Sequence, residues 1–158
     1  MKGPLFYSKI LVFGEYGIIK DSKGLSIPYN FYKGALKHSQ NHSALSKESN
    51  TILQDYLQYL KTIDTNLVRF KLDQMALDIS DGMYFDSSIP RGYGVGSSGA
   101  LVAAIYDRYA LDKVTVLENL TRDKLLKLKV IFAEMESFFH GKSSGLDPLN
   151  SYLSLPIL

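Results

Sequence analysis

The pattern of apolar and polar residues predicts two strands at the start of the chain. Residues 8–15 form a short apolar run interrupted by Gly14, which is typical of a buried strand. Residues 21–24 carry the polar and glycine residues of a turn. Residues 25–36 alternate weakly and are rich in Tyr and Phe, so we predict a second strand, with Pro28 at an edge or a bulge. Residues 1–36 are therefore expected to form a β-hairpin.

Helical periodicity dominates the rest of the chain. Apolar residues recur at three-to-four spacing over residues 47–64, which predicts a helix with Ser46 as its N-cap. Residues 66–80 fit a helix or a strand equally well. The later elements are expected to be a strand over residues 83–87, a glycine-dense loop over 90–99 and helices over 100–109 and 122–140. Thr121 would cap the last of these, and Asp147-Pro148 can begin another helix. This order of elements predicts an α+β fold.

Composition narrows the class of protein. A length of 158 residues suits one domain, and a hydrophobic content of 46% can supply its core. The net charge of +2 gives no reason to expect a nucleic acid or a membrane as partner. The sequence has no cysteine, which excludes disulfides, Cys-zinc sites and thiol catalysis. Apolar runs are far shorter than the roughly 20 residues of a membrane span, and no signal peptide is evident, so we expect a cytoplasmic protein.

The loop from Pro90 to Ala100 carries the most informative chemistry. Its glycines permit positive φ and leave no Cβ in the way of a ligand; they are Gly92, Gly94, Gly96 and Gly99. Ser97 and Ser98 stand where a helix begins, and a helix N-terminus attracts anions through unpaired N–H groups and a partial positive charge.

The residues of this loop leave two alternatives open. The loop is either a phosphate-binding loop or a tight strand-to-helix turn with Ser97 as the N-cap. A Walker A loop is excluded because the Gly-Lys-Ser/Thr ending is missing. A dinucleotide-binding loop is disfavoured because the preceding strand is short and no acidic residue closes a second strand.

Three collinear segments resemble the signatures of the GHMP kinases, which include galactokinase, homoserine kinase, mevalonate kinase and phosphomevalonate kinase. The loop resembles the second signature, a proline and a short spacer before Gly-Leu-Gly-Ser-Ser-Ala, with Val95 for leucine and Gly99 for alanine. Residues 9–16 resemble the first signature, with Tyr16 in place of histidine. Residues 136–147 resemble a segment of the mevalonate kinases, in which glutamate precedes His-Gly and then Ser-Gly-x-Asp.

The resemblance implies a fold and an activity. The fold would be that of ribosomal protein S5 domain 2, a mixed or antiparallel sheet backed by helices, with a left-handed βαβ crossover. The activity would be ATP-dependent phosphorylation of a small alcohol, expected to be mevalonate, to 5-phosphomevalonate in isoprenoid precursor synthesis. The alternatives are another GHMP kinase, acting on phosphomevalonate or a sugar, and a non-catalytic nucleotide- or metabolite-binding module.

The resemblance also implies a role for individual residues. The nucleotide would contact Gly92, Gly94, Val95, Gly96, Ser97, Ser98 and Gly99. Ser98 and Glu136 would hold Mg²⁺, and Asp147 would be the general base beside Lys9. The substrate would contact Glu15, His140 and Ser144, with Ser143 as a further candidate.

Taken singly, three of these residues have an ordinary structural interpretation. Glu136 suits a solvated helix position, Asp147 suits an N-cap, and Lys9 suits an exposed site at the start of a strand. Arg91 and Tyr93 lie in the loop within reach of a phosphate, although no motif requires them.

The length of the chain adds a last expectation. GHMP kinases are longer and carry a third, glycine-rich motif that is missing here. We therefore expect residues 1–158 to be the amino-terminal, nucleotide- and substrate-binding domain without its carboxy-terminal domain. Apolar surface would then be exposed, which predicts weak or no activity and self-association into a homo-oligomer.

Overall fold

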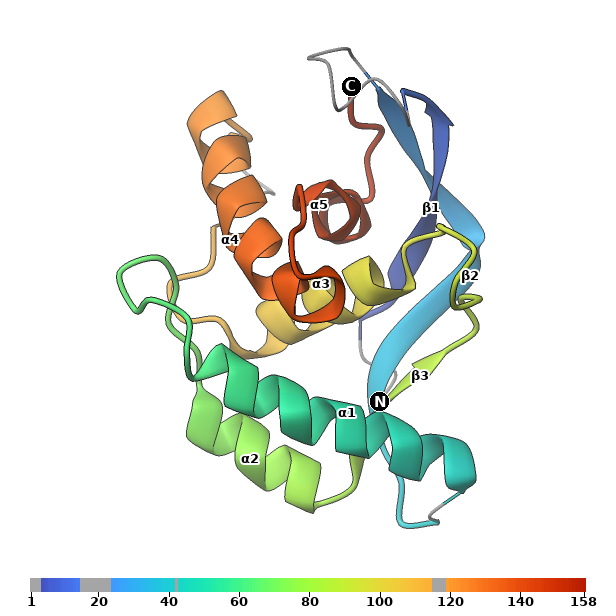
Figure 1. Cartoon of the computed structure of the whole chain (residues 1–158), viewed down its shortest axis with the longest axis vertical. Coiled ribbons are helices and arrows are strands. Elements are labelled where there is room, and N and C mark those ends of the chain that lie inside the picture. Colours follow the sequence, from blue (N-terminus) through green and yellow to red (C-terminus); the bar gives the residue numbers. More distant parts are fainter. Residues whose placement is uncertain (1–3, 15–23, 42, 115–118) are drawn as a thin grey trace.

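The computed structural model describes residues 4–14, 24–41, 43–114 and 119–158 and shows an antiparallel sheet with helices on one side (Figure 1). The sheet has the order β1-β2-β3, with β1 at Phe6–Phe13, β2 at Leu25–His38 and β3 at Met83–Ser87. The helices are α1 (Ala44–Leu60), α2 (Leu72–Ser80), α3 (Ser97–Tyr109), α4 (Arg122–His140) and α5 (Leu146–Leu153). The predicted α+β class is confirmed.

The expected hairpin is present as β1 and β2, with an irregular register. Tyr7 pairs with Lys33 and Ser8 pairs with Tyr29, so residues 30–32 of β2 form a bulge. Pro28 lies just before this bulge, on the half of β2 that β3 does not reach. The prediction for Pro28 is therefore confirmed. Both strand pairs are antiparallel, so the left-handed crossover has no counterpart among the described strands.

Helix α1 begins earlier than predicted. Its N-cap is Ser43, whose side chain accepts a hydrogen bond from the backbone N–H of Ser46. The predicted cap at Ser46 is wrong, because this residue lies inside the first turn and donates its hydroxyl to the Ser43 carbonyl oxygen. The helix also ends at Leu60 instead of Asp64. Residues 66–80, left ambiguous by the sequence, contain α2.

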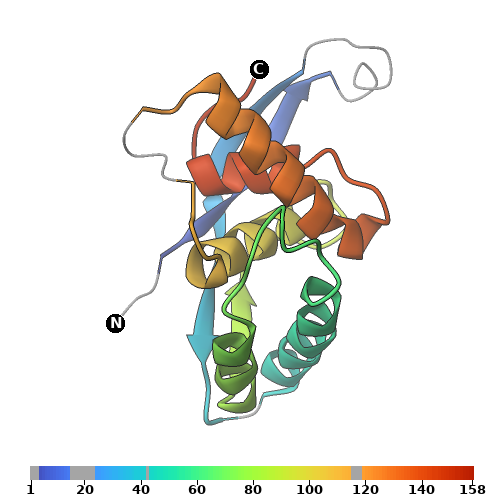
Figure 2. The same cartoon turned by 90° about the vertical axis from the view of Figure 1, so that its left-hand side faces the viewer.

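Helix α3 is the centre of the fold. One core cluster packs Ala100, Ala103 and Ala104 against Phe6 and Ile89, and the larger cluster lies on the other side, toward α1, α2 and α4. Residues 99–106 of α3 are all buried, which explains the run of Ala, Leu, Val and Ile in this part of the helix. In Figure 2, α4 and α5 lie on one side of α3, and α2 lies on the other.

Two further helix starts position the site. Helix α3 starts at Ser97, three residues before the predicted position, and its N-cap is Gly96 with a φ of 82°. The alternative in which Ser97 is the N-cap is therefore wrong. The predicted bounds of α4 and its cap are confirmed, since Thr121 accepts a hydrogen bond from Lys124 N–H. Helix α5 has Gly145 as its N-cap, so Asp147 lies in its first turn and the N-cap interpretation of Asp147 is wrong.

A membrane-spanning role is not supported by the helices. Within the described part of the chain, none has both the length and the apolar character that a membrane crossing requires.

Candidate active site

The N-terminus of α3 is the place where the predicted site residues meet. The loop before it is attached to β1, because the backbone N–H of Lys9 donates to the carbonyl oxygen of Val95 at 3.0 Å. The end of α4 reaches the same place through Glu136, and α5 reaches it through Asp147. Segments distant in the sequence therefore surround one helix terminus, which favours negative charge.

Ser98 connects α3 to α4 through two contacts. Its hydroxyl lies 3.0 Å from Oε1 of Glu136 and 2.9 Å from Nε2 of His140. The other carboxylate oxygen of Glu136 accepts a hydrogen bond from Ser143, in the turn between α4 and α5. One carboxylate oxygen of Glu136 therefore contacts the start of α3, and the other contacts the turn between α4 and α5.

Glu136 is nearly inaccessible to solvent, with 3% of its surface exposed. The interpretation of Glu136 as a solvated helix residue is therefore wrong. Burial raises the pKa of this carboxyl above its ordinary value, and the nearby Asp147 raises it further, while hydrogen bonds from Ser143 and Ser98 act in the opposite direction. None of the described ion pairs includes Glu136. A buried carboxylate of this kind is a good ligand for a cation.

Lys9 and Asp147 form an ion pair beside the start of α3. The ammonium nitrogen of Lys9 lies 3.1 Å from Oδ1 of Asp147, and the two side chains are 10% and 36% exposed. Lys9 as a whole is 8% exposed, so its interpretation as a surface residue is wrong. Its stem passes Gly96, where an added Cβ would lie 3.1 Å from Cγ of Lys9. The glycine loop thus leaves just enough room for the lysine to reach Asp147.

Gly99 is required for packing and not for an unusual backbone. The prediction of positive φ holds for Gly92, Gly94 and Gly96, whereas Gly99 is a regular helical residue. A Cβ at position 99 would lie 2.8 Å from the carbonyl carbon of Asp147 and 2.9 Å from its Cβ. The first turns of α3 and α5 therefore touch at this glycine, which sets the position of Asp147.

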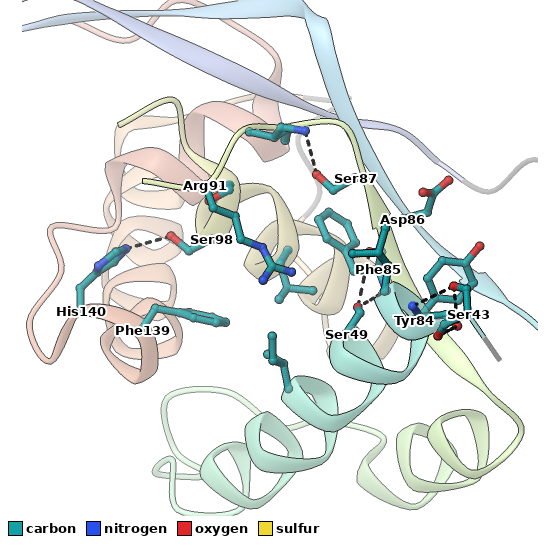
Figure 3. Close-up of a pocket in the computed structure, with 16 residues that line it drawn as sticks. Ser43, Ser49, Tyr84, Phe85, Asp86, Ser87, Arg91, Ser98, Phe139 and His140 are labelled. Carbon is teal, nitrogen blue, oxygen red and sulfur yellow. Dashed lines mark hydrogen bonds between the residues drawn. The ribbon is translucent and has the colours of Figure 1, made fainter. Parts of the chain in front are cut away.

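A cleft of about 480 Å³ opens beside the Ser98 side of the site (Figure 3). Its walls come from α1, β3, the glycine loop and the ends of α3 and α4. The polar and charged side chains that line it are Ser43, Ser46, Ser49, Tyr84, Asp86, Ser87, Arg91, Ser97, Ser98 and His140. Its size lies within the range of small-ligand sites.

Of the three residues predicted to contact the substrate, one lines the cleft. His140 lines the cleft and touches Ser98. Ser144 is exposed in the turn before α5, and its hydroxyl accepts a hydrogen bond from Leu146 N–H. Glu15 lies outside the described residues. Ser144 was predicted as the substrate contact and Ser143 only as a further candidate, whereas Ser143 is the one that binds Glu136.

The part of the cleft wall that α1 forms was not predicted from the sequence. Ser49 is buried in this wall and accepts a hydrogen bond from Phe85 N–H in β3. No local pattern marks this contact, because Ser46 and Ser49 are ordinary polar residues of an amphipathic helix. Only the packing of α1 beside β3 brings them to the cleft.

The α3 terminus, the buried carboxylate of Glu136 and the Lys9–Asp147 pair therefore lie together beside a cleft. Phosphoryl transfer uses groups of these kinds. Residues 57–154, more than half of the chain, match the family described as GHMP kinases N terminal domain. The chain belongs to this family of ATP-using kinases of small molecules. The matched range contains Ser98, Glu136 and Asp147, while Lys9 precedes it. No match is found among curated proteins.

Proposed function

We propose that this chain serves the ATP-dependent phosphorylation of a small-molecule alcohol, with mevalonate as the acceptor and 5-phosphomevalonate as the product. The observation that carries the proposal is the convergence of Ser98–Glu136 and Lys9–Asp147 on one helix terminus. Phosphoryl transfer needs neutralised phosphates, a positioned hydroxyl and an acceptor for its proton. The two pairs supply groups suited to these needs at the start of α3.

The nucleotide phosphates would lie against the first turn of α3. The backbone N–H groups of this turn and the hydroxyls of Ser97 and Ser98 are donors to phosphate oxygens. Gly92 and Gly94 leave the loop backbone open, since an added Cβ at either position would meet nothing within 4 Å. The cleft beside Ser98 would then hold the nucleoside.

The donor set at Glu136 fits Mg²⁺, which prefers carboxylate and hydroxyl oxygens. Glu136 has a desolvated carboxylate, and Ser98 brings a hydroxyl oxygen to 3.0 Å from it. Within the described residues, no cluster of three His, Asp or Glu side chains forms a complete metal site. Ser98 and Glu136 would therefore provide part of a shell that phosphate oxygens complete. When bound, the ion neutralises phosphate charge.

Asp147 would receive the proton of the acceptor alcohol. The hydroxyl oxygen forms a bond to the γ-phosphorus, the bond from that phosphorus to the bridging oxygen breaks, and ADP leaves with the electron pair. Lys9, 3.1 Å from Asp147, places a positive charge where the alkoxide and the moving phosphoryl group develop negative charge. Mevalonate is proposed as the acceptor because residues 136–147 resemble the corresponding mevalonate kinase segment.

The test compares Asp147→Asn with Asp55→Asn, an exposed aspartate of α1. Turnover is measured as ADP release with mevalonate, phosphomevalonate and a sugar panel, and nucleotide affinity is measured with a fluorescent ATP analogue. We expect at most weak turnover of mevalonate by the parent protein, its loss in Asp147→Asn with nucleotide affinity retained, and no effect of Asp55→Asn. Unchanged turnover in Asp147→Asn would exclude its role as the base. Nucleotide binding without turnover of any alcohol would favour a non-catalytic module.

The proposal extends to location and assembly. We place the reaction in the cytoplasm, where ATP is available, without a nucleic acid or membrane partner. We also propose association into a homo-oligomer, since β1 and β2 expose several apolar side chains. Val12, Phe13 and Phe31 are 52%, 50% and 73% exposed, respectively.

A further inference from the structure

Arg91 occupies a position that neither its motif nor its fold class requires. It follows Pro90 in the glycine loop and lines the cleft together with Ser97 and Ser98. Its guanidinium lies 3.0 Å from a carboxylate oxygen of Glu48 on α1. In Figure 3 the Arg91 side chain extends from the loop into the space between Ser98 and Ser49. Because Glu48 belongs to α1, the Arg91–Glu48 pair connects the glycine loop to α1.

The charges around the cleft make Arg91 distinctive. Only two of the described residues that line it carry a permanent charge, Arg91 and Asp86, and Asp86 is already paired with Lys37. The glycine loop has no lysine of the Walker A type that would reach a phosphate. Arg91 is therefore the one permanent positive charge that the described cleft lining offers to a nucleotide.

The contact with Glu48 is of a kind that a phosphate can replace. The two side chains are 66% and 58% exposed, and exposed ion pairs are weak. A guanidinium binds a phosphate through two parallel N–H donors, and a triphosphate carries several negative charges close to the helix terminus. The ion pair is thus the weaker of two arrangements open to Arg91.

We propose that Arg91 is a nucleotide-phosphate ligand of this protein and that Glu48 competes with the phosphate for it. The inference rests on the proposed nucleotide site. In the absence of nucleotide, Glu48 holds Arg91 against α1. On binding, Arg91 exchanges the carboxylate for phosphate oxygens, which frees the α1 side of the cleft.

The experiment measures dissociation constants for ATP, ADP and adenosine in Arg91→Gln, Glu48→Gln and the double variant. The matched control is Asp112→Asn, which removes an exposed Arg–Asp pair elsewhere. We expect Arg91→Gln to weaken ATP about tenfold or more, as for a lost charge-assisted hydrogen bond. Glu48→Gln should tighten ATP by up to about fivefold, the range of an exposed ion pair. Asp112→Asn should change neither.

Two features separate this proposal from its alternatives. The double variant should bind like Arg91→Gln alone, and adenosine, which has no phosphate, should bind equally to all variants. Equal ATP affinity in Arg91→Gln and the parent protein would overturn the ligand role, and weaker binding in Glu48→Gln would overturn the competition. A parent protein that binds none of the three ligands would instead refute the proposed nucleotide site and this inference with it. A parent that binds ATP while Arg91→Gln has no effect refutes the inference alone.

Discussion

Substitution of Gly99 by alanine tests whether the contact between α3 and α5 is as close as the structure shows. Helix propensity alone favours this change, because alanine in a helix interior is about 1 kcal/mol more favourable than glycine. The contact opposes it. The new Cβ would lie 2.8 Å from the carbonyl carbon of Asp147, 2.9 Å from its Cβ and 2.9 Å from the nitrogen of Pro148.

The magnitude follows from these distances. Carbon atoms prefer separations of about 3.5–4.0 Å, so α5 would have to move by roughly 0.6–1.2 Å. The atoms that obstruct the Cβ belong to the backbone or to the first side-chain carbon, so no rotamer change can remove the contact. Overpacking of this kind costs about 1–3 kcal/mol. After the gain in propensity, the net effect is a destabilisation of about 0–2 kcal/mol.

Thermal unfolding shows whether Gly99→Ala stabilises or destabilises the protein, and kinetics shows how it changes turnover. For a protein of this size, 1 kcal/mol corresponds to about 2–4 °C, so the midpoint should fall by as much as about 8 °C. The control is Thr51→Ala at an exposed position of α1, which should be neutral or slightly stabilising. Gly99→Ala should also lower turnover more than nucleotide affinity, because it displaces Asp147 and not the cleft. A midpoint that rises by 2–4 °C would refute the close contact.

Two further predictions concern Glu136 and the exposed sheet. Because burial raises the pKa of Glu136, stability without Mg²⁺ should fall as pH rises above the ordinary value of 4.5 and level off above the raised value. Glu136→Gln should therefore be more stable than the parent at neutral pH and equal to it near pH 4. The control is Glu134→Gln, at an exposed position of the same helix. A stability difference between Glu136→Gln and the parent that is the same at all pH values would contradict the burial argument. Light scattering should show self-association that Phe31→Ser weakens, and a monodisperse parent monomer at high concentration would contradict it.

Elements whose ends are marked by local chemistry were predictable from the sequence. Both ends of α4 were predicted correctly. The side chain of Thr121 caps the start of the helix and Gly141 follows its last residue, and each of these signals acts within one helical turn. The start of α1 was not predictable in this way. Ser43 and Ser46 are both good caps, and they bond to each other, so only the packing of the helix decides between them.

The burial of Glu136 was present in the sequence pattern but was outweighed by its charge. Leu128, Phe132 and Glu136 are spaced four residues apart and share one face of α4, which also carries Met135. A helical stripe that is apolar except for one carboxylate indicates that the carboxylate is buried as well. Its contact with Ser98 needs the tertiary fold, since the two residues are 38 positions apart.

The Lys9–Asp147 contact lies beyond any local pattern, since only the family resemblance implied it. It depends on three close approaches of the backbone. The carbonyl of Val95 accepts a hydrogen bond from β1, Gly96 lies beside the side chain of Lys9, and Gly99 packs against α5. Each approach requires a small residue or a free carbonyl at one position. The loop motif therefore has a second physical reason besides phosphate binding, because it lets β1 and α5 meet at the end of α3.

The two acidic residues of the site differ in environment, and the difference supports a division of labour between them. Glu136 is buried, has a raised pKa and has no cation among its described ion partners, so ionising it is costly until a positive ion arrives. Asp147 is about one third exposed and already faces a lysine, so its charge is compensated before any ligand binds. If the metal bound Asp147 instead, Glu136 would keep an uncompensated buried charge, and the metal ion and Lys9 would compete for Asp147. This asymmetry supports the proposed roles that the family resemblance implied, with the metal at Glu136 and the proton at Asp147.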